Sequence, residues 1–142
     1  GLLDITRNVN DYLTSWQLPD NAFTAVEKAT VERLMSHTGG TSVGGFAGYA
    51  SGAAVPTLLQ TLQGLPPANN IAVQPIYTPG TKYQYSGGGM ETLRLMTVDL
   101  TGQPFRSYIR DSLLTPLGMA SSDYVQPLSG PLLLRAAATF RP

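Results

Sequence analysis

The sequence predicts a mainly α-helical fold. Apolar residues recur at three- and four-residue steps over 31–37 and 87–100, the spacing that gives a helix one buried face. A third stretch, 104–114, begins with a proline, whose fixed φ suits the first turn of a helix. With 142 residues, the chain has the length of one domain or of part of a larger one.

The first part of the chain predicts short helical segments. Residues 9–13 suggest a helical turn or two, which the breaking residues at 19–21 end. Thr30 is a suitable N-cap for a helix over 31–37, because its hydroxyl can accept a hydrogen bond from a backbone N–H of the first turn.

The middle of the chain predicts a glycine-rich loop. No Asp, Glu, Lys or Arg occurs over 34–81, and Gly40, Gly44, Gly48 and Gly52 fall at every fourth residue. Packed membrane helices space small residues in this way. The segment nevertheless has too many helix breakers and too few apolar residues to span a bilayer, which needs about 20 of them. We therefore predict a loop here, and no membrane span.

The remaining elements follow in chain order. A helix is expected over 56–62, which starts with a proline. Residues 71–76 are expected to form a short strand or an extended arm. Gly102 suits the left-handed cap of the 87–100 helix, and a last helix is expected over 132–140.

Composition and charge exclude several classes of function. Nine basic and nine acidic residues cancel, so nothing draws the chain to nucleic acid or to an anionic membrane. Without cysteine there is neither a disulfide nor a thiolate site, and one histidine with scattered carboxylates predicts no metal site. No signal peptide is visible, and the compartment stays open. Only 13% of the residues are charged, which indicates that part of the surface is normally covered by another part of a larger protein or by a partner.

The stretch 79–89 (PGTKYQYSGGG) holds the strongest candidate for chemistry. A turn delivers Tyr85 and Ser86 to the N-terminal end of the helix over 87–100, where free N–H groups and the helix dipole favour negative charge. A phenol there exchanges protons more readily, because its phenolate is stabilised. The glycines that follow allow a substrate or another backbone to approach closely. The alternative is an ordinary helix start in which Tyr85 is a buried core ring.

The pattern Pro-Gly-x-x-x-x-Tyr-Ser-x-x-Gly resembles the second signature of the class C β-lactamases, the D,D-peptidases of the penicillin-binding-protein type and related esterases. In that family the tyrosine helps to move protons to and from a nucleophilic serine, and the resemblance gives this role to Tyr85. The family's asparagine, which contacts the substrate amide, falls on Gly87. This departure makes the chain more similar to the esterase and peptidase branches.

Other stretches resemble the same family in the same order. Residues 34–40 (LMSHTGG) are similar to the family's Leu-Leu-Ser-His-Thr-Ser-Gly helix end, and 9–13 to the segment after the nucleophile helix. Residues 100–105 and 116–119 are similar to the helices that follow the tyrosine motif. The resemblance implies the helical domain portion of the α/β β-lactamase/transpeptidase-like fold, with 1–142 as a single partial domain without its central helix.

Two signatures of the family are missing from the chain. The nucleophile belongs to a Ser-x-x-Lys motif, but Ala25 precedes Lys28 and Pro79 precedes Lys82 at that spacing. No lysine or histidine follows Tyr85 to form the third signature, Lys-Thr-Gly or His-x-Gly. The resemblance therefore implies a fragment of a serine hydrolase that works through an acyl-serine. Its nucleophilic serine and lysine would lie outside this chain, and the chain would be inactive alone.

The resemblance also implies a site and its partners. Tyr85 would be catalytic, Ser86 and Gly87 would line the site, and Phe46 and Tyr49 would rim a pocket for the acyl or leaving group. Substrates would be small esters, amides or β-lactams, and no cofactor is implied. An apolar groove left by the absent helix could allow self-association. Family members are often periplasmic or secreted.

His37 is interpreted as a structural residue that hydrogen-bonds a loop backbone. Residues 37–39 spell His-x-Gly, but they precede Tyr85 and fall inside the helix-end match, so they are not the third signature.

Two other functions stay open. One is a Ser-His hydrolase in which Ser86 is the nucleophile, His37 the base, and Asp99 or Asp123 the orienting carboxylate. The other is a non-catalytic helical binding or interaction module derived from the family, which would use the glycine-rich loop and the groove for a partner.

Overall fold

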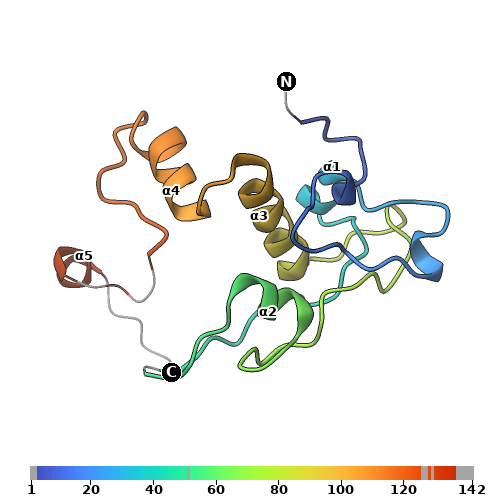
Figure 1. Ribbon diagram of the computed structural model, residues 1–142, viewed down its shortest axis with the longest axis horizontal. Coiled ribbons are helices and arrows are strands. Elements are labelled where there is room, and N and C mark those ends of the chain that lie inside the picture. Colours follow the sequence, from blue (N-terminus) through green and yellow to red (C-terminus); the bar gives the residue numbers. More distant parts are fainter. Residues whose placement is uncertain (1–2, 51, 126–127, 129, 137–142) are drawn as a thin grey trace. The chain divides into compact units, whose positions relative to one another are not determined.

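The computed structural model describes residues 3–50, 52–125, 128 and 130–136. The chain divides into two compact units, Gly1–Gly102 and Gln103–Pro142, which are described separately (Figure 1). The regular structure of the described residues is helical, which confirms the predicted class, and none of these helices is long and apolar enough to cross a membrane. A single domain over 1–142 stays a prediction.

The first unit is built around α3 (Gly87–Thr101). Both α1 (Val31–Met35) and α2 (Leu58–Gln63) pack against α3 (Figure 1). Two 3-10 turns, η1 (Val9–Asp11) and η2 (Ala22–Thr24), precede α1, and the first of them confirms the helical turn expected at 9–13.

The start of α1 follows the sequence prediction, and its end comes early. The Thr30 hydroxyl accepts a hydrogen bond from the N–H of Arg33 at 3.3 Å, as expected of an N-cap. The helix stops at Met35 because His37 has a φ of 57°, in the left-handed region. The N–H of Thr38 then returns to the carbonyl of Arg33 at 2.8 Å and closes the helix.

The start of α2 corrects the prediction that the proline at 56 opens this helix. Thr57 is the N-cap, and its hydroxyl accepts from the N–H of Gln60 at 3.2 Å. The Gln60 side chain accepts in return from the N–H of Thr57 at 2.8 Å. This reciprocal pair of hydrogen bonds is a capping box. Its Thr-x-x-Gln spacing was visible in the sequence, but the prediction placed the helix start at the proline instead.

By contrast, α3 matches its prediction closely. The expected helix over 87–100 is observed as Gly87–Thr101, and Gly102 closes it with a φ of 66°. Glycine suits this position because it has no Cβ to oppose the left-handed conformation.

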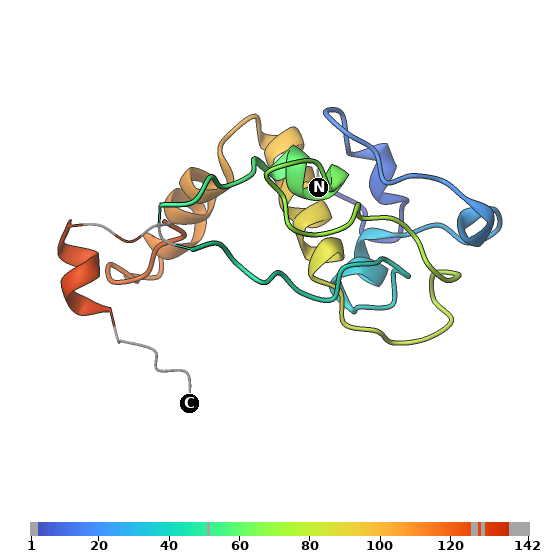
Figure 2. The same ribbon diagram turned by 90° about the horizontal axis from the view of Figure 1, so that it is seen from below.

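The arm at 71–76 is extended, and among the described residues it forms no strand. An isolated antiparallel bridge joins Pro75 to Thr41. Beside it the N–H of Ser42 donates to the carbonyl of Gln74 at 2.9 Å. The arm therefore fixes the start of the glycine-rich loop, whose irregular backbone confirms the loop prediction. The loop then runs away from α3 and returns at α2 (Figure 2).

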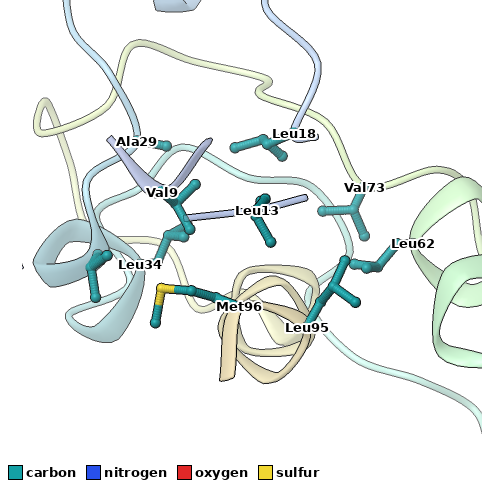
Figure 3. Close-up of a cluster of buried hydrophobic side chains, with 10 residues drawn as sticks. Val9, Leu13, Leu18, Ala29, Leu34, Leu62, Val73, Leu95 and Met96 are labelled. Carbon is teal, nitrogen blue, oxygen red and sulfur yellow. The ribbon is translucent and has the colours of Figure 1, made fainter. Parts of the chain in front are cut away.

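Buried hydrophobic side chains join the elements of the first unit (Figure 3). Burying one such side chain contributes about 1.5–3 kcal/mol to folding. Leu95 and Met96 come from α3, Leu62 from α2 and Val73 from the extended arm. The other members, from the N-terminal segments and α1, are Val9, Leu13, Leu18, Ala29, Val31 and Leu34.

Asp99 near the end of α3 ties the N-terminal segment to this core. Its carboxylate accepts hydrogen bonds from the N–H groups of Thr14 at 2.7 Å and Ser15 at 3.1 Å, and from the Ser15 hydroxyl at 2.7 Å. Burial alone would raise the pKa of Asp99, but these hydrogen bonds outweigh it and hold the pKa below its usual range.

In the second unit, α4 (Phe105–Ile109) continues into η3 (Arg110–Leu114), a π-helical turn. Together they confirm the helix expected over 104–114. Two hydrogen bonds from Arg106, at 2.6 and 2.7 Å, lower the pKa of Asp123 to about 2. The last described helix, α5 (Gly130–Arg135), overlaps the one expected over 132–140, of which 137–140 lie outside the described residues.

Leu62→Ala should lower the free energy of unfolding by about 2–5 kcal/mol, because it empties a fully buried position in the core. Leu65→Ala, two residues beyond the end of α2 at a half-exposed position, is the matched control and should change little. Urea denaturation followed by circular dichroism measures both. Equal losses in the two variants would contradict the described core.

Asp99→Asn should cost about 1.5–3 kcal/mol near neutral pH, because a charged acceptor of three hydrogen bonds is lost. The pKa of Asp99 is lower in the folded state, so its contribution is complete above the unfolded pKa of about 3.9 and disappears as the pH falls through the folded value. The stability difference between wild type and variant should therefore shrink below about pH 4. A difference that grows on acidification would contradict this assignment.

Candidate functional site

The loop after α1 and the start of α3 form one structure. The N–H of Gln84 donates to the carbonyl of His37 at 2.9 Å. The N–H of Gly88 donates to the carbonyl of Val43 at 2.9 Å, and the N–H of Gly87 donates to the carbonyl of Gly44 at 3.2 Å. The loop therefore wraps the N-terminus of α3.

Ser86 lies at the centre of this contact and is only 3% exposed. It is the N-cap of α3, and its hydroxyl accepts from the N–H of Gly89 at 3.0 Å. The same hydroxyl accepts from the Thr41 hydroxyl at 2.8 Å and donates to the carbonyl of Ser42 at 2.9 Å. The sequence predicted that Ser86 lines the site, but the hydrogen bonds of its hydroxyl all serve the fold.

These contacts correct one expectation about the start of α3. Its first N–H groups were expected to be free and to stabilise a phenolate. They instead donate to the carbonyls of Gly44 and Val43 and to the hydroxyl of Ser86. Loop backbone thus satisfies donors that a helix N-terminus otherwise offers to an anion.

Tyr85 precedes this cap and projects outward. Its side chain is 59% exposed, so the alternative of a buried core ring is wrong. The ring lies against the imidazole of His37, with the two centroids 4.4 Å apart and the planes tilted by 38°. The Nδ1 of His37 accepts from the N–H of Ser86 at 3.3 Å, which confirms His37 as a residue that hydrogen-bonds a loop backbone.

The same geometry does not support the Ser-His triad. The Ser86 hydroxyl is directed to loop groups, whereas His37 bonds the backbone N–H of that serine. Asp99 is occupied by the segment after η1, and Asp123 is held by Arg106. The described partners of these four residues therefore differ from those that a triad requires.

Phe46 and Gly87 are brought together, and Tyr49 has another partner. A Cβ on Gly87 would lie 3.1 Å from Cε2 of Phe46, so the ring covers the place where a side chain would stand. The Tyr49 hydroxyl accepts from the N–H of Asn69 at 3.1 Å, and the Asn69 side chain donates to the carbonyl of Gly48 at 2.8 Å. Tyr49 thus ties the loop to the connection after α2.

Sequence reasoning missed the buried hydroxyls of Thr41 and Ser42. Both are almost fully buried, and the Ser42 hydroxyl donates to the carbonyl of Ala72 at 3.0 Å while it accepts from the N–H of Gln74 at 3.0 Å. Two adjacent hydroxyl residues in a loop without charged groups were the available signal. They link the extended arm to the cap of α3.

Lys82 and Tyr77 form a second feature that the sequence did not indicate. The Lys82 ammonium lies 4.3 Å from the centroid of the Tyr77 ring, in the range of a cation–π interaction. Burial raises the pKa of Tyr77, and its hydroxyl has no hydrogen-bond partner among the described residues. The pair spans the turn at 79–80 that precedes Tyr85.

Comparison with known proteins agrees with this architecture. The sequence matches the family model described as Beta-lactamase over residues 1–140. The structure is similar to the crystal structure of a beta-lactamase/D-alanine carboxypeptidase from Yersinia pestis complexed with citrate, with a TM-score of 0.69 and 22% identity. This similarity covers 94% of this chain and 36% of that chain, so the chain spans about a third of the structure that it matches. It confirms the expected helical portion of that fold. No curated protein matches the chain.

Gly88→Ala should detach the loop from α3. The new Cβ would lie 2.6 Å from the carbonyl oxygen of Ser42 and 2.9 Å from a methyl of Val73, so we expect a loss of about 1–3 kcal/mol in unfolding free energy. Gly87→Ala is the matched control, because its Cβ would meet the edge of the Phe46 ring at 3.1 Å and the carbonyl oxygen of Gly44 at 3.4 Å, neither of them as close as the neighbours of Gly88. Urea titrations of both variants measure the difference. A Gly88→Ala protein as stable as Gly87→Ala would contradict the close approach.

Proposed function

Because this chain belongs to the beta-lactamase family, we propose that it is the tyrosine-bearing part of a serine hydrolase that cleaves ester or amide bonds through an acyl-serine. Small esters, D-amino-acid amides and β-lactams are the proposed substrates. The observation that carries the proposal is Tyr85, an exposed phenol fixed at the start of α3.

Tyr85 is proposed to take a proton from the nucleophilic serine and to return one to the leaving group. A group with this role must come within hydrogen-bond reach of the reacting atoms, and an exposed phenol meets that requirement. It must also be held in direction, because small displacements of a catalytic group are costly. The fixed backbone on both sides of Tyr85, at Gln84 and Ser86, supports this part of the proposal.

The remaining site residues are proposed to act in different ways. Ser86 is proposed to support the site through its cap of α3, and Gly87 is proposed to line the site together with the Phe46 ring, which packs where a side chain would stand. Phe46 packs beside Gly87 and is still 39% exposed to solvent. It is proposed as an apolar rim for the acyl or leaving group. Tyr49 is proposed as an outer rim residue whose hydroxyl also holds the loop.

The nucleophile is proposed to come from outside this chain. The 142 residues contain no Ser-x-x-Lys, and no lysine or histidine follows Tyr85. A lysine one helical turn from the serine is what activates the hydroxyl in such a motif.

The chain alone should therefore react neither with a fluorescent penicillin nor with a fluorophosphonate probe. Its self-association through exposed apolar surface stays a prediction that sedimentation velocity tests.

Tyr85→Phe should strongly lower the rate of the reaction when this chain is combined with a separately expressed polypeptide that carries the family's Ser-x-x-Lys segment. Removal of one general acid–base group lowers a rate by about 10²- to 10⁴-fold. Tyr83→Phe is the matched control, since it removes another exposed phenol two residues away and should leave the rate of probe labelling unchanged.

Three results would count against the proposal. Equal labelling rates in Tyr85→Phe and wild type would remove the tyrosine from the chemistry. Labelling of this chain alone would place the nucleophile within it, and loss of that labelling in His37→Ala would restore the Ser-His alternative. Binding of a protein partner without labelling under any condition would favour the non-catalytic module.

A further inference from the structure

His37 contacts four consecutive residues of the segment that carries the exposed phenol. Its carbonyl accepts from the N–H of Gln84 at 2.9 Å, and its Nδ1 accepts from the N–H of Ser86 at 3.3 Å. Its ring covers one face of Tyr85, with the centroids 4.4 Å apart, and the ring of Tyr83 meets the imidazole edge-on at 6.0 Å. One residue thus restrains the backbone on both sides of Tyr85 and the ring between them.

The backbone of His37 lies in a region that few residues with a side chain adopt. His37 follows Ser36, the C-cap of α1, and has a φ of 57°. Glycine or asparagine usually occupies this position, because a Cβ opposes the left-handed conformation. A histidine held at such a place points to a use for its imidazole.

The hydrogen bond also fixes the state of the ring. An Nδ1 that accepts from a backbone N–H carries a lone pair, so the neutral imidazole holds its proton on Nε2. Because this bond stops rotation of the ring, the face turned to the phenol of Tyr85 is constant. The phenol then has one covered face and remains largely exposed elsewhere.

We propose that His37 is a positioning residue that holds the Tyr85 phenol in the direction of proton transfer. The orientation itself follows from the contacts above, whereas its use in proton transfer rests on the proposed function. His37 does not touch the substrate in this role, and it acts through Tyr85 alone.

Nuclear magnetic resonance of the full chain with ring-labelled tyrosine tests the orientation. The Tyr85 signals are identified by their loss in Tyr85→Phe. In His37→Gly the order parameters of the Tyr85 ring, which loss of the imidazole ring current does not alter, should fall toward those of a free tyrosine, and the Ser86 amide signal should move. His37→Asn should keep the Ser86 amide near its wild-type position, because the asparagine oxygen can accept from it and asparagine tolerates a positive φ. Met35→Ala, an exposed residue at the end of α1, should change neither measurement.

A merely structural role predicts a different pattern. It would leave the Tyr85 ring order parameters unchanged in folded His37→Gly. We expect them to fall in the folded state, while relief of the positive φ offsets part of the stability lost with the hydrogen bond to Ser86. Unchanged Tyr85 ring order parameters in both His37→Gly and His37→Asn would overturn the proposal.

The complemented assembly tests the catalytic use. His37→Gly should lower kcat for an ester substrate by about 10- to 100-fold with KM unchanged, since a misplaced group loses rate and not binding. His37→Asn should recover part of kcat. Equal kcat in wild type and His37→Gly would overturn the positioning role, even with lowered Tyr85 ring order parameters. A wild-type assembly without any reaction would reject the proposed function and the catalytic use together, and the ring order parameters would then still decide whether His37 holds Tyr85.

Discussion

The Ser86 hydroxyl is the contact on which the first unit depends. It caps α3 through Gly89, receives the Thr41 hydroxyl and donates to the carbonyl of Ser42, all at a position that is almost closed to solvent. A buried hydroxyl without partners is costly, so these bonds are needed to keep Ser86 at this position. The loop and the helix are consequently joined at one atom, and the arm is tied to the same loop through the Ser42 hydroxyl. Tyr85 is the residue directly before Ser86.

This contact explains the three glycines that open α3. A Cβ at Gly88 would meet the carbonyl of Ser42, and one at Gly89 would lie 2.9 Å from the Thr41 hydroxyl. Glycine is a poor helix former, and three of them at a helix start lower its intrinsic stability. The loop compensates, because its carbonyls satisfy N–H groups that the first turn leaves free. The run of glycines that suggests room for a substrate is thus mainly room for the chain's own backbone, with Gly87 as the outer member.

The sequence was most informative where structure depends on local spacing. Apolar periodicity located α3, and Thr30 and Gly102 marked helix ends, because caps act within a few residues. It was least informative where residues about 45 positions apart meet. Nothing local shows that Thr41 and Ser86 share a hydrogen bond, or that loop carbonyls fill the N-terminus of α3. Tyr85 was singled out by its pattern with neighbours, but its exposure is decided by packing that only the fold reveals.

The saturated helix start limits how the phenol can act. The N–H groups expected to favour a phenolate are turned to Val43, Gly44 and Ser86, so they are not aimed at Tyr85. If the proposed function holds, charge that develops on the phenol must be balanced by groups that approach from its exposed side, as the lysine of a Ser-x-x-Lys motif would. In that arrangement this chain orients the Tyr85 phenol for proton transfer, through a fixed backbone and the His37 ring. The rest of the enzyme supplies the groups that stabilise the charge on the phenol.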